Sequence, residues 1–196
     1  MKSKLYNSLI FVREFLKNPG RVGAVAPSSS ALAAEITKQA GVQQAQTIIE
    51  FGAGTGSFTS QILRQKRPDS FFAAFEINPR LARSLTNQFP DALILNDSAE
   101  NTPQLLNKYG LPHADCIVSG LPWASFSEDI QDKLLQAAFN ALGPQGRFAT
   151  FAYLQGLLLP AGRRFRKKLF QTFSQVQTGR TVWKNLPPAF VYRCVK

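Results

Sequence analysis

Short apolar runs alternate along this chain with longer segments in which apolar residues recur every three or four positions. The runs have the length and composition of buried strands, and the longer segments have the periodicity of helices that cover one face of a sheet. Strands are expected at residues 46–51, 71–76, 92–96, 114–119 and 147–153, and helices at 57–66, 79–88, 101–108 and 127–141. Strands that alternate with helices in this way form a parallel sheet with helices on both faces.

The ends of the chain extend this alternating pattern. Three serines, residues 28–30, can cap a helix that Gly41 ends. After the fifth strand come a basic helix near residues 163–171 and two strand-like runs, 173–183 and 189–195, which suit an antiparallel hairpin. The expected fold class is therefore α/β, with a mostly parallel seven-stranded sheet, helices on both faces and a terminal antiparallel hairpin.

The N-terminal segment has two interpretations. Residues 3–17 have the pattern of an amphipathic helix, whose apolar stripe can pack on the core of the domain or rest on a membrane interface. The apolar run within it, residues 9–12, is too short for a secretory signal. We interpret residues 1–20 as a membrane-contacting helix and residues 21–196 as one domain, because a chain of 196 residues with 44% hydrophobic content can bury one substantial core.

The net charge of +11 is unevenly distributed. Every Asp and Glu lies at or before Asp132, whereas residues 133–196 carry eleven Lys and Arg and no acid. Such a cationic surface attracts phosphates, whether on nucleic acid or on anionic lipid headgroups. One histidine and two cysteines cannot form the usual zinc sites, and no acidic cluster has metal-ligand spacing, so no metal is expected.

The strongest chemical signal is the turn after the first strand, where Glu50 precedes Gly52, Gly54 and Gly56. Glycines without a Cβ let a ligand lie on the main chain, and the helix that follows offers unpaired N–H groups. Twenty residues after Gly56, Glu76 ends the second strand, where its carboxylate can accept both hydroxyls of a ribose. The two features together indicate a nucleoside-type cofactor.

The spacing of the glycines distinguishes between the classes of cofactor that such a turn can bind. A dinucleotide site has Gly-x-Gly-x-x-Gly, whereas the third glycine here comes one residue early. A Walker loop is excluded because no Gly-Lys-Ser/Thr follows, and a purely structural glycine turn is the remaining alternative. The pattern Glu-x-Gly-x-Gly-x-Gly resembles the first motif of class I S-adenosylmethionine-dependent methyltransferases. This resemblance implies a Rossmann-like fold, S-adenosylmethionine as cofactor and S-adenosylhomocysteine as its product.

The ends of the second and third strands extend the cofactor site. Asp97 can accept a hydrogen bond from the exocyclic amine of adenine, and Ser98 and Ala99 add a backbone donor. An acid after a strand is often only a helix cap, but this one lies in register with Glu76 and the glycine turn. We therefore expect Ile77, Asp97, Ser98 and Ala99 to contact the cofactor as well.

The segment Ser119-Gly120-Leu121-Pro122-Trp123 follows the fourth strand, where amino-methyltransferases keep an [Asn/Asp/Ser]-Pro-Pro-aromatic loop. Methyl transfer to nitrogen needs a neutral amine held in line with the sulfonium methyl. The Ser119 hydroxyl and loop carbonyls can accept the amine protons, and Trp123 can stack on a base or bind a methylated ammonium. The alternative is a tight turn closed by a core tryptophan. The expected catalytic residues are Ser119, Gly120, Leu121, Trp123 and Tyr153, and Ser119 is also expected to contact the cofactor.

Segments 15–29, 50–56, 119–122 and 185–189 together resemble the bacterial phospholipid N-methyltransferase family, with Ser-Gly-Leu-Pro and Asn-Leu-Pro-Pro-Ala as the most specific pair. The resemblance covers nearly the whole chain. It implies methylation of phosphatidylethanolamine, through mono- and dimethyl intermediates, to phosphatidylcholine. It also implies that the N-terminal helix contacts the membrane, so that a cytoplasmic protein associates peripherally with the inner membrane.

A lipid substrate needs cations for its phosphate near the amine. Arg180 and Lys184 flank the strand that leads to Asn185, and Tyr153 ends the fifth strand. These four are the candidate substrate-binding residues, although ordinary surface charge and a core-edge tyrosine would explain them too. The basic cluster at residues 163–168 is expected to meet anionic lipid rather than the substrate. No dedicated base is evident, apart from the Tyr153 hydroxyl or a chain of waters.

Two other functions stay open. The phospholipid enzymes are similar to ribosomal RNA adenine dimethylases, whose motif is Asn-Leu/Ile-Pro-Tyr/Phe. In this chain Ser119 and Gly120 precede Leu-Pro, and Trp123 fills the aromatic position. A non-catalytic module that binds the cofactor or nucleic acid through the same cationic face is the other alternative.

Overall fold

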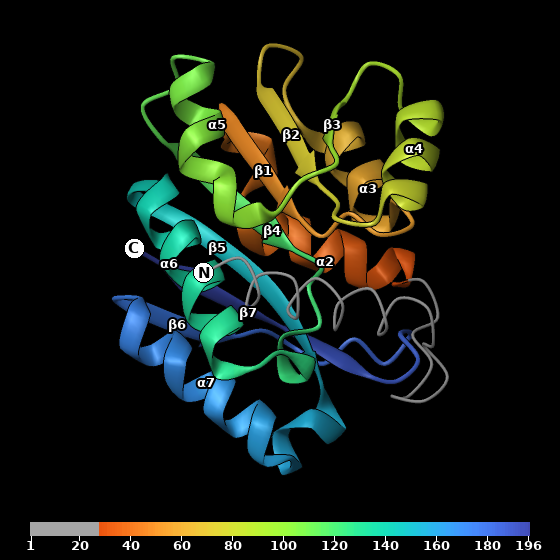
Figure 1. The fold of residues 1–196 in the computed structure, drawn as a ribbon. Coiled ribbons are helices and arrows are strands. Elements are labelled where there is room, and N and C mark those ends of the chain that lie inside the picture. The colour runs from red at the N-terminus through yellow and green to blue at the C-terminus, as the bar shows by residue number, and fades with distance from the viewer. Residues whose placement is uncertain (1–27) are drawn as a thin grey trace.

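The computed structural model describes residues 28–196, which form a seven-stranded sheet in the order β3-β2-β1-β4-β5-β7-β6 (Figure 1). Strands β1 to β5 are parallel, and β7 runs antiparallel between β5 and β6. The strands are β1 (Thr47–Phe51), β2 (Phe71–Phe75), β3 (Leu93–Leu95), β4 (Ala114–Ser119), β5 (Leu142–Tyr153), β6 (Gln175–Thr178) and β7 (Ala189–Val195). The expected fold class, including the terminal antiparallel hairpin, is confirmed.

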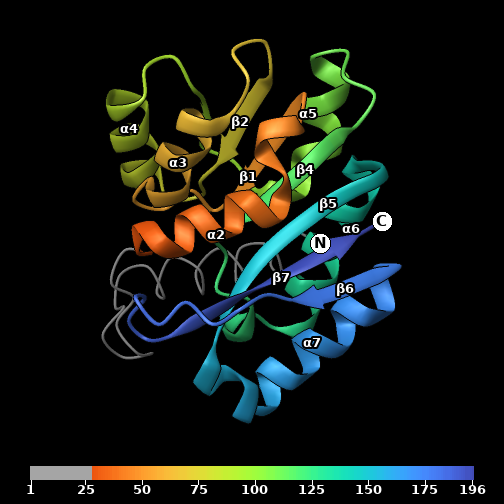
Figure 2. The same ribbon diagram turned by 180° about the vertical axis from the view of Figure 1, so that it is seen from behind.

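Helices cover both faces of the sheet, and each face has its own apolar layer. Helices α2, α3 and α4 bury residues such as Ile36, Ile62 and Leu85 against one face, which is nearer the viewer in Figure 2. Helices α5, α6 and α7 bury residues such as Leu105 and Phe165 against the other. The helices are α2 (Ser30–Ala40), α3 (Ser57–Gln65), α4 (Pro79–Gln88), α5 (Thr102–Lys108), α6 (Glu128–Ala141) and α7 (Pro160–Thr172), with short 3-10 turns η2 (Val42–Gln44), η3 (Ala99–Asn101), η4 (Trp123–Ser125) and η5 (Leu154–Leu158).

Local capping explains where several helices begin and end. The Ser29 hydroxyl accepts a hydrogen bond from the Leu32 N–H at the start of α2, and Gly41 ends that helix in the left-handed region at φ +76°. Asn78 caps α4, and Pro79 occupies its first turn. Because these signals are local, the expected bounds of both helices agree closely with the structure.

The two strands that differ most from expectation, β5 and β6, lie at irregular positions. β5 begins at Leu142 rather than at residue 147, because Leu142 pairs with Ala114 of β4, and a shift in register separates this pair from the next one, Arg147 with Cys116. β6 ends at Thr178 rather than at residue 183, because residues 179–188 form a loop. This loop contacts β7 through the Gly179 N–H, which donates to the Val191 carbonyl at 2.8 Å, and through an isolated bridge between Val182 and Ala189.

The amphipathic segment expected at residues 3–17, and the domain boundary after residue 20, lie outside the described residues. Between residues 28 and 196, no helix has both the length and the apolar character needed to cross a membrane.

Candidate active site

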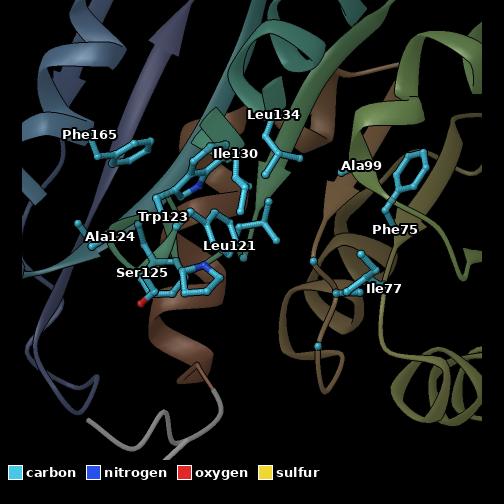
Figure 3. Close-up of a pocket in the computed structure, with 18 of the residues that line it drawn as sticks. Phe75, Ile77, Ala99, Leu121, Trp123, Ala124, Ser125, Ile130, Leu134 and Phe165 are labelled. Atoms are coloured by element: carbon cyan, nitrogen blue, oxygen red, sulfur yellow. The ribbon is translucent and has the colours of Figure 1, made fainter. Parts of the chain in front are cut away.

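A cavity of about 880 Å³ opens at the carboxyl ends of the parallel strands. This is the edge where open parallel sheets bind ligands, and the volume lies near the top of the range of about 300–1,000 Å³ that is usual for ligand pockets. Its two walls face each other in Figure 3. Phe75, Ile77 and Ala99 form one wall, and residues of η4, α6 and α7, including Trp123 and Phe165, form the other.

The glycine turn forms part of the cavity floor. The backbone N–H groups of Gly52 and Ala53 both donate to the Phe75 carbonyl, at 2.9 and 3.1 Å, and this fixes the turn against β2. Gly54 has φ +58° and lines the cavity, and a Cβ added to it would meet nothing within 4 Å. The backbone of Gly54 is therefore bare toward the cavity, as a ligand that lies on the main chain requires.

Glu76 is held rigidly beside that turn. Its side chain is 3% exposed, its Oε2 accepts from the Gly54 N–H at 2.8 Å, and its Oε1 accepts from the Asn78 N–H at 2.8 Å. Burial raises the pKa of this carboxyl, while the backbone hydrogen bonds oppose the rise. Asn96, which lies at a strand end as the sequence indicates, donates from Nδ2 to the carbonyls of Glu76 and Ile77 at 2.9 and 3.1 Å, and thereby ties the ends of β2 and β3 together.

Glu50 and Gly56, both expected to contact the cofactor, do not line the cavity. Glu50 is completely buried, and its Oε2 accepts from the Thr59 hydroxyl at 2.8 Å. Its Oε1 has no partner among the described residues, and burial raises the pKa of this carboxyl to about 8. A Cβ at Gly56 would press on Phe89 at 2.8 Å. Both residues support the turn from behind.

The third acidic position, Asp97, lines the cavity and is exposed. Its Oδ1 accepts from the Ser98 N–H at 2.7 Å, and both oxygens accept from the Asn101 Nδ2 at 2.9 Å. The Ser98 hydroxyl caps η3 by accepting from the Glu100 N–H at 3.3 Å. The residue that caps the helix is therefore Ser98. Asp97 and Ala99 both line the cavity, where they remain candidates for contact with adenine.

Ser119 and Trp123 are arranged differently from expectation. Ser119 is fully buried and does not line the cavity, and its Oγ accepts from the Trp123 Nε1 at 3.0 Å and from the Leu121 N–H at 3.4 Å. Its acceptor positions are therefore already used, so it orients the indole rather than a bound amine. Trp123 is 2% exposed and stacks on Phe165 with the ring centroids 4.8 Å apart, which covers one face of the indole. The buried Gln131 fixes the same loop by donating from Nε2 to the Trp123 carbonyl at 2.7 Å.

Gly120 lies where the glycine turn and the loop after β4 meet. A Cβ at this position would lie 2.6 Å from the Gly52 carbonyl oxygen and 3.5 Å from the ring of Phe58. Because the nearest atom belongs to the backbone, this position cannot carry a side chain without moving the cofactor turn. Leu121, the next residue, lines the cavity directly.

Charge divides the cavity into two halves. Among residues 28–196, the charged residues that line the cavity lie on or beside β2, η3 and α6, and we call the lining from these elements the charged half: Glu76, Asp97, Glu100 and Lys133. The other half is lined from α3, β5, η5 and α7 by residues without charge, and we call it the uncharged half. Tyr153 is half-buried there, and burial raises the pKa of its hydroxyl.

The candidate substrate residues do not gather in this cavity. Asn185 is 3% exposed, its Oδ1 accepts from the Ser29 N–H at 2.9 Å, and its Nδ2 donates to the Pro187 carbonyl at 2.8 Å. It therefore ties a loop to the start of α2. Arg180 and Lys184 are exposed and do not line the cavity, so of the four only Tyr153 does. The strand periodicity of residues 147–153 could have indicated Phe151 as its neighbour on the same face.

Residues 28–182 match the family model described as ribosomal RNA adenine dimethylase. An ornithine lipid N-methyltransferase of Singulisphaera acidiphila is 29% identical over 188 residues, which cover 94% of each chain. A probable ribosomal RNA small subunit methyltransferase A of Methanosarcina mazei is 33% identical over 111 residues, which cover 55% of this chain and 35% of that protein.

The fold also has solved counterparts. An O-methyltransferase from Bacillus cereus, crystallised in complex with S-adenosylhomocysteine, superposes with a TM-score of 0.69 at 14% identity, and the match covers 95% of this chain and 90% of that one. Residues 28–196 contain no group of three or more His, Cys, Asp and Glu side chains placed to hold a metal ion.

Proposed function

The chain belongs to the ribosomal RNA adenine dimethylase family and is an S-adenosylmethionine-dependent methyltransferase, and we propose that it methylates the amine of a membrane lipid. The proposed substrate is phosphatidylethanolamine, which would be converted through mono- and dimethyl forms to phosphatidylcholine. The observation that carries the proposal is the uncharged half of the cavity, which adjoins the cofactor turn and is lined by aromatic and aliphatic side chains.

The residues present fit the cofactor. S-adenosylmethionine supplies a methyl group on a positively charged sulfur. Gly52 and Gly54 offer bare backbone, Glu76 offers a rigid carboxylate for ribose hydroxyls, and Ile77 and Ala99 offer apolar contacts for the adenine. The side chains that would hold the cofactor thus come from the charged half, which leaves the uncharged half for the methyl acceptor.

The uncharged half favours a neutral amine. A primary amine in water has a pKa of about 10.4, and transfer to a place without charge or water lowers that pKa because the charged form is disfavoured. We propose that the amine gives its proton to water on entry, so that its lone pair is free to attack. This explains how the reaction proceeds although no carboxylate or imidazole of residues 28–196 lines this half, and although burial raises the pKa of the Tyr153 hydroxyl and so favours its protonated form.

Two observations favour a lipid amine over an adenine of RNA. Adenine dimethylases carry an asparagine where this chain has Gly120, and here the Gly52 carbonyl leaves no space for any side chain at that position. An amide that could bind the exocyclic amine of an adenine is therefore missing. The relative that matches along 94% of both chains is a lipid N-methyltransferase, whereas the match to the RNA methyltransferase of Methanosarcina mazei covers 35% of that protein.

The proposal extends to the membrane. We propose that residues 1–20 contact the bilayer and that the protein associates peripherally with the inner membrane from the cytoplasm. The basic residues of α7 support this in part. Arg164 and Lys168 pair with Glu128 and Asp132 of α6 and so serve the fold. Three further cations of α7 are exposed and form no ion pair with described residues: Arg163, Arg166 and Lys167.

The test is a competition between lipid and RNA in one reaction. Purified protein is incubated with radiolabelled S-adenosylmethionine, vesicles of phosphatidylethanolamine and anionic phospholipid, and ribosomal RNA. The label is expected in the lipid extract as one, two and three added methyl groups. Label in RNA alone would contradict the proposal, and parallel vesicles with an ornithine lipid show whether another amino lipid is preferred.

A pair of variants controls the assay. Glu76→Ala removes the carboxylate that holds the Gly54 N–H and would accept both ribose hydroxyls, and it should lower transfer by at least about 100-fold, because each of these two hydrogen bonds to a charged group is worth roughly 1.5–3 kcal/mol. Asp91→Ala removes an exposed acid that does not line the cavity, and transfer should be unchanged.

A further inference from the structure

Three aromatic rings form a continuous row along the uncharged half of the cavity. Phe58 of α3 packs edge-to-face on Phe151 of β5, with centroids 5.8 Å apart and an angle of 83° between the rings. Phe151 packs in the same way on Tyr153, at 5.5 Å and 81°. All three line the cavity. We call these residues the aromatic row.

The row begins at the point where the cofactor turn meets the loop after β4. Phe58 lies against Gly120, whose Cβ position is 3.5 Å from the ring, and the same position is 2.6 Å from the Gly52 carbonyl oxygen. Because the cofactor turn contains Gly52, the ring of Phe58 is close to any group that receives a methyl there. Tyr153, the last residue of β5, lies at the other end of the row.

The surroundings of the row suit a cation that cannot form hydrogen bonds. No charged side chain lines the cavity from α3, β5, η5 or α7, and the Tyr153 hydroxyl has no hydrogen-bond partner among the described residues. A quaternary ammonium has no N–H to donate, so its attraction to a protein comes mainly from the faces of aromatic rings and from counter-charges. In this half the aromatic rings are the side chains that can attract such a cation, because the polar ones there, Ser57 and Gln155, carry no charge.

We propose that Phe58, Phe151 and Tyr153 recognise the methylated ammonium that each transfer produces. This inference rests on the proposed function and adds how the cavity retains partly methylated lipids between successive transfers. In each transfer a nitrogen–carbon bond forms as a sulfur–carbon bond breaks, and the positive charge passes from sulfur to nitrogen. In the first two transfers the nitrogen then loses a proton to water, whereas after the third the charge is permanent. The row stabilises that charge more as methyl groups accumulate.

The test measures binding without turnover. Hexylphosphocholine is titrated into the protein by calorimetry, beside an analogue in which carbon replaces the quaternary nitrogen. The two probes have the same shape and differ in charge, so their affinity ratio isolates the attraction of the rings for a cation. Wild type should prefer the cationic probe by roughly 5- to 30-fold, the range that one or two desolvated cation–π contacts provide.

Variants test whether the aromatic row causes the preference for the cationic probe. Phe151→Leu and Tyr153→Leu should remove most of it, whereas Tyr153→Phe keeps the ring and should retain it. Tyr109→Leu, which changes an exposed aromatic residue outside the cavity, is the matched control and should behave as wild type. Thermal melting of each variant shows that it is folded.

The outcomes separate this inference from the proposed function. Equal affinity of wild type for the two probes, or equal loss of both in the leucine variants, would overturn the aromatic recognition site even if lipid is methylated. Label in RNA alone, in the competition assay, would overturn the proposed function.

Discussion

Two buried carboxyl groups lie beside the glycine turn and serve different purposes. Glu76 faces the cavity and has both oxygens fixed by backbone N–H groups. Glu50 lies behind the turn, has one oxygen without a partner among the described residues, and has a pKa raised to about 8 by burial. The proton of Glu50 therefore belongs to the folded state at neutral pH, since an ionised carboxylate without water or a counter-charge is costly.

The proton on the Glu50 carboxyl makes the free energy of unfolding depend on pH. The pKa of Glu50 is raised from 4.5 to about 8 in the folded protein, so between these values the folded state binds a proton that the unfolded state has lost. Stability should fall as pH rises through this window. Glu50→Gln keeps the Thr59 hydrogen bond without the titrating group, and its melting temperature should fall less over the same pH range. Parallel pH profiles for the two proteins would contradict this.

At the scale of residues, the sequence predicts positions better than contacts. Glu76 and Asp97 were predictable as cavity residues because an acid that directly follows a parallel strand must lie at its carboxyl end. The roles of Ser119 and Asn185 were not predictable, because each depends on a partner distant in space, the indole of Trp123 and the N–H of Ser29. Phe58 was hidden for the same reason, since its neighbour Phe151 comes from another element.

At the scale of elements, one amide joins the C-terminal loop to the first described helix. Asn185 accepts from the N–H of Ser29, the N-cap of α2, and donates to the Pro187 carbonyl. Asn185→Ala would leave these buried groups unpaired at a cost of about 2 kcal/mol. For a chain of this size the melting temperature should then fall by roughly 4–8 °C. A change of affinity for lipid without any loss of stability would instead favour the substrate-binding role that the sequence predicts.

The contact between α6 and α7 is the second element-scale feature. Lys168 pairs with Asp132 and donates to the Glu128 carbonyl at 3.2 Å, whereas the neighbouring Lys167 is exposed and forms no ion pair with described residues. Lys168→Ala should lower stability by up to about 1 kcal/mol, because exposed ion pairs contribute little. Lys167→Ala should leave stability unchanged but weaken binding to anionic vesicles by roughly 5-fold. The reverse order in melting and vesicle sedimentation would contradict this division.

Most elements followed from local signals in the sequence, and the exceptions have a structural cause. Helix α4 agrees with expectation at both ends because Asn78, Pro79 and a clear period define it. β5 was expected to be shorter, because glycine and proline at residues 143–146 are typical of loops, yet the strand continues through them to Leu142, which pairs with Ala114 of β4. Tertiary pairing of this kind has no local signature.

At the scale of the whole molecule, the charged side chains of residues 28–196 that line the cavity lie on the cofactor side, and the acceptor side has none. The acids end at Asp132, and those that line the cavity belong to the half with the glycine turn. If the acceptor must enter the uncharged half as a neutral amine, kcat/KM for phosphatidylethanolamine should rise about tenfold per pH unit from about pH 6 to about pH 8, below the pKa of the amine. A flat profile over this range would show that an enzyme group removes the proton instead.

The central claim is that this molecule moves a methyl group from S-adenosylmethionine to a lipid amine, and lipid mass spectrometry tests it most directly. The full chain and its Glu76→Ala variant are produced at equal levels in a bacterium that makes phosphatidylethanolamine but no methylated form. The account predicts phosphatidylethanolamine with one, two and three added methyl groups from wild type, and none from the variant. Unmodified lipid from cells that contain folded wild-type protein would contradict it.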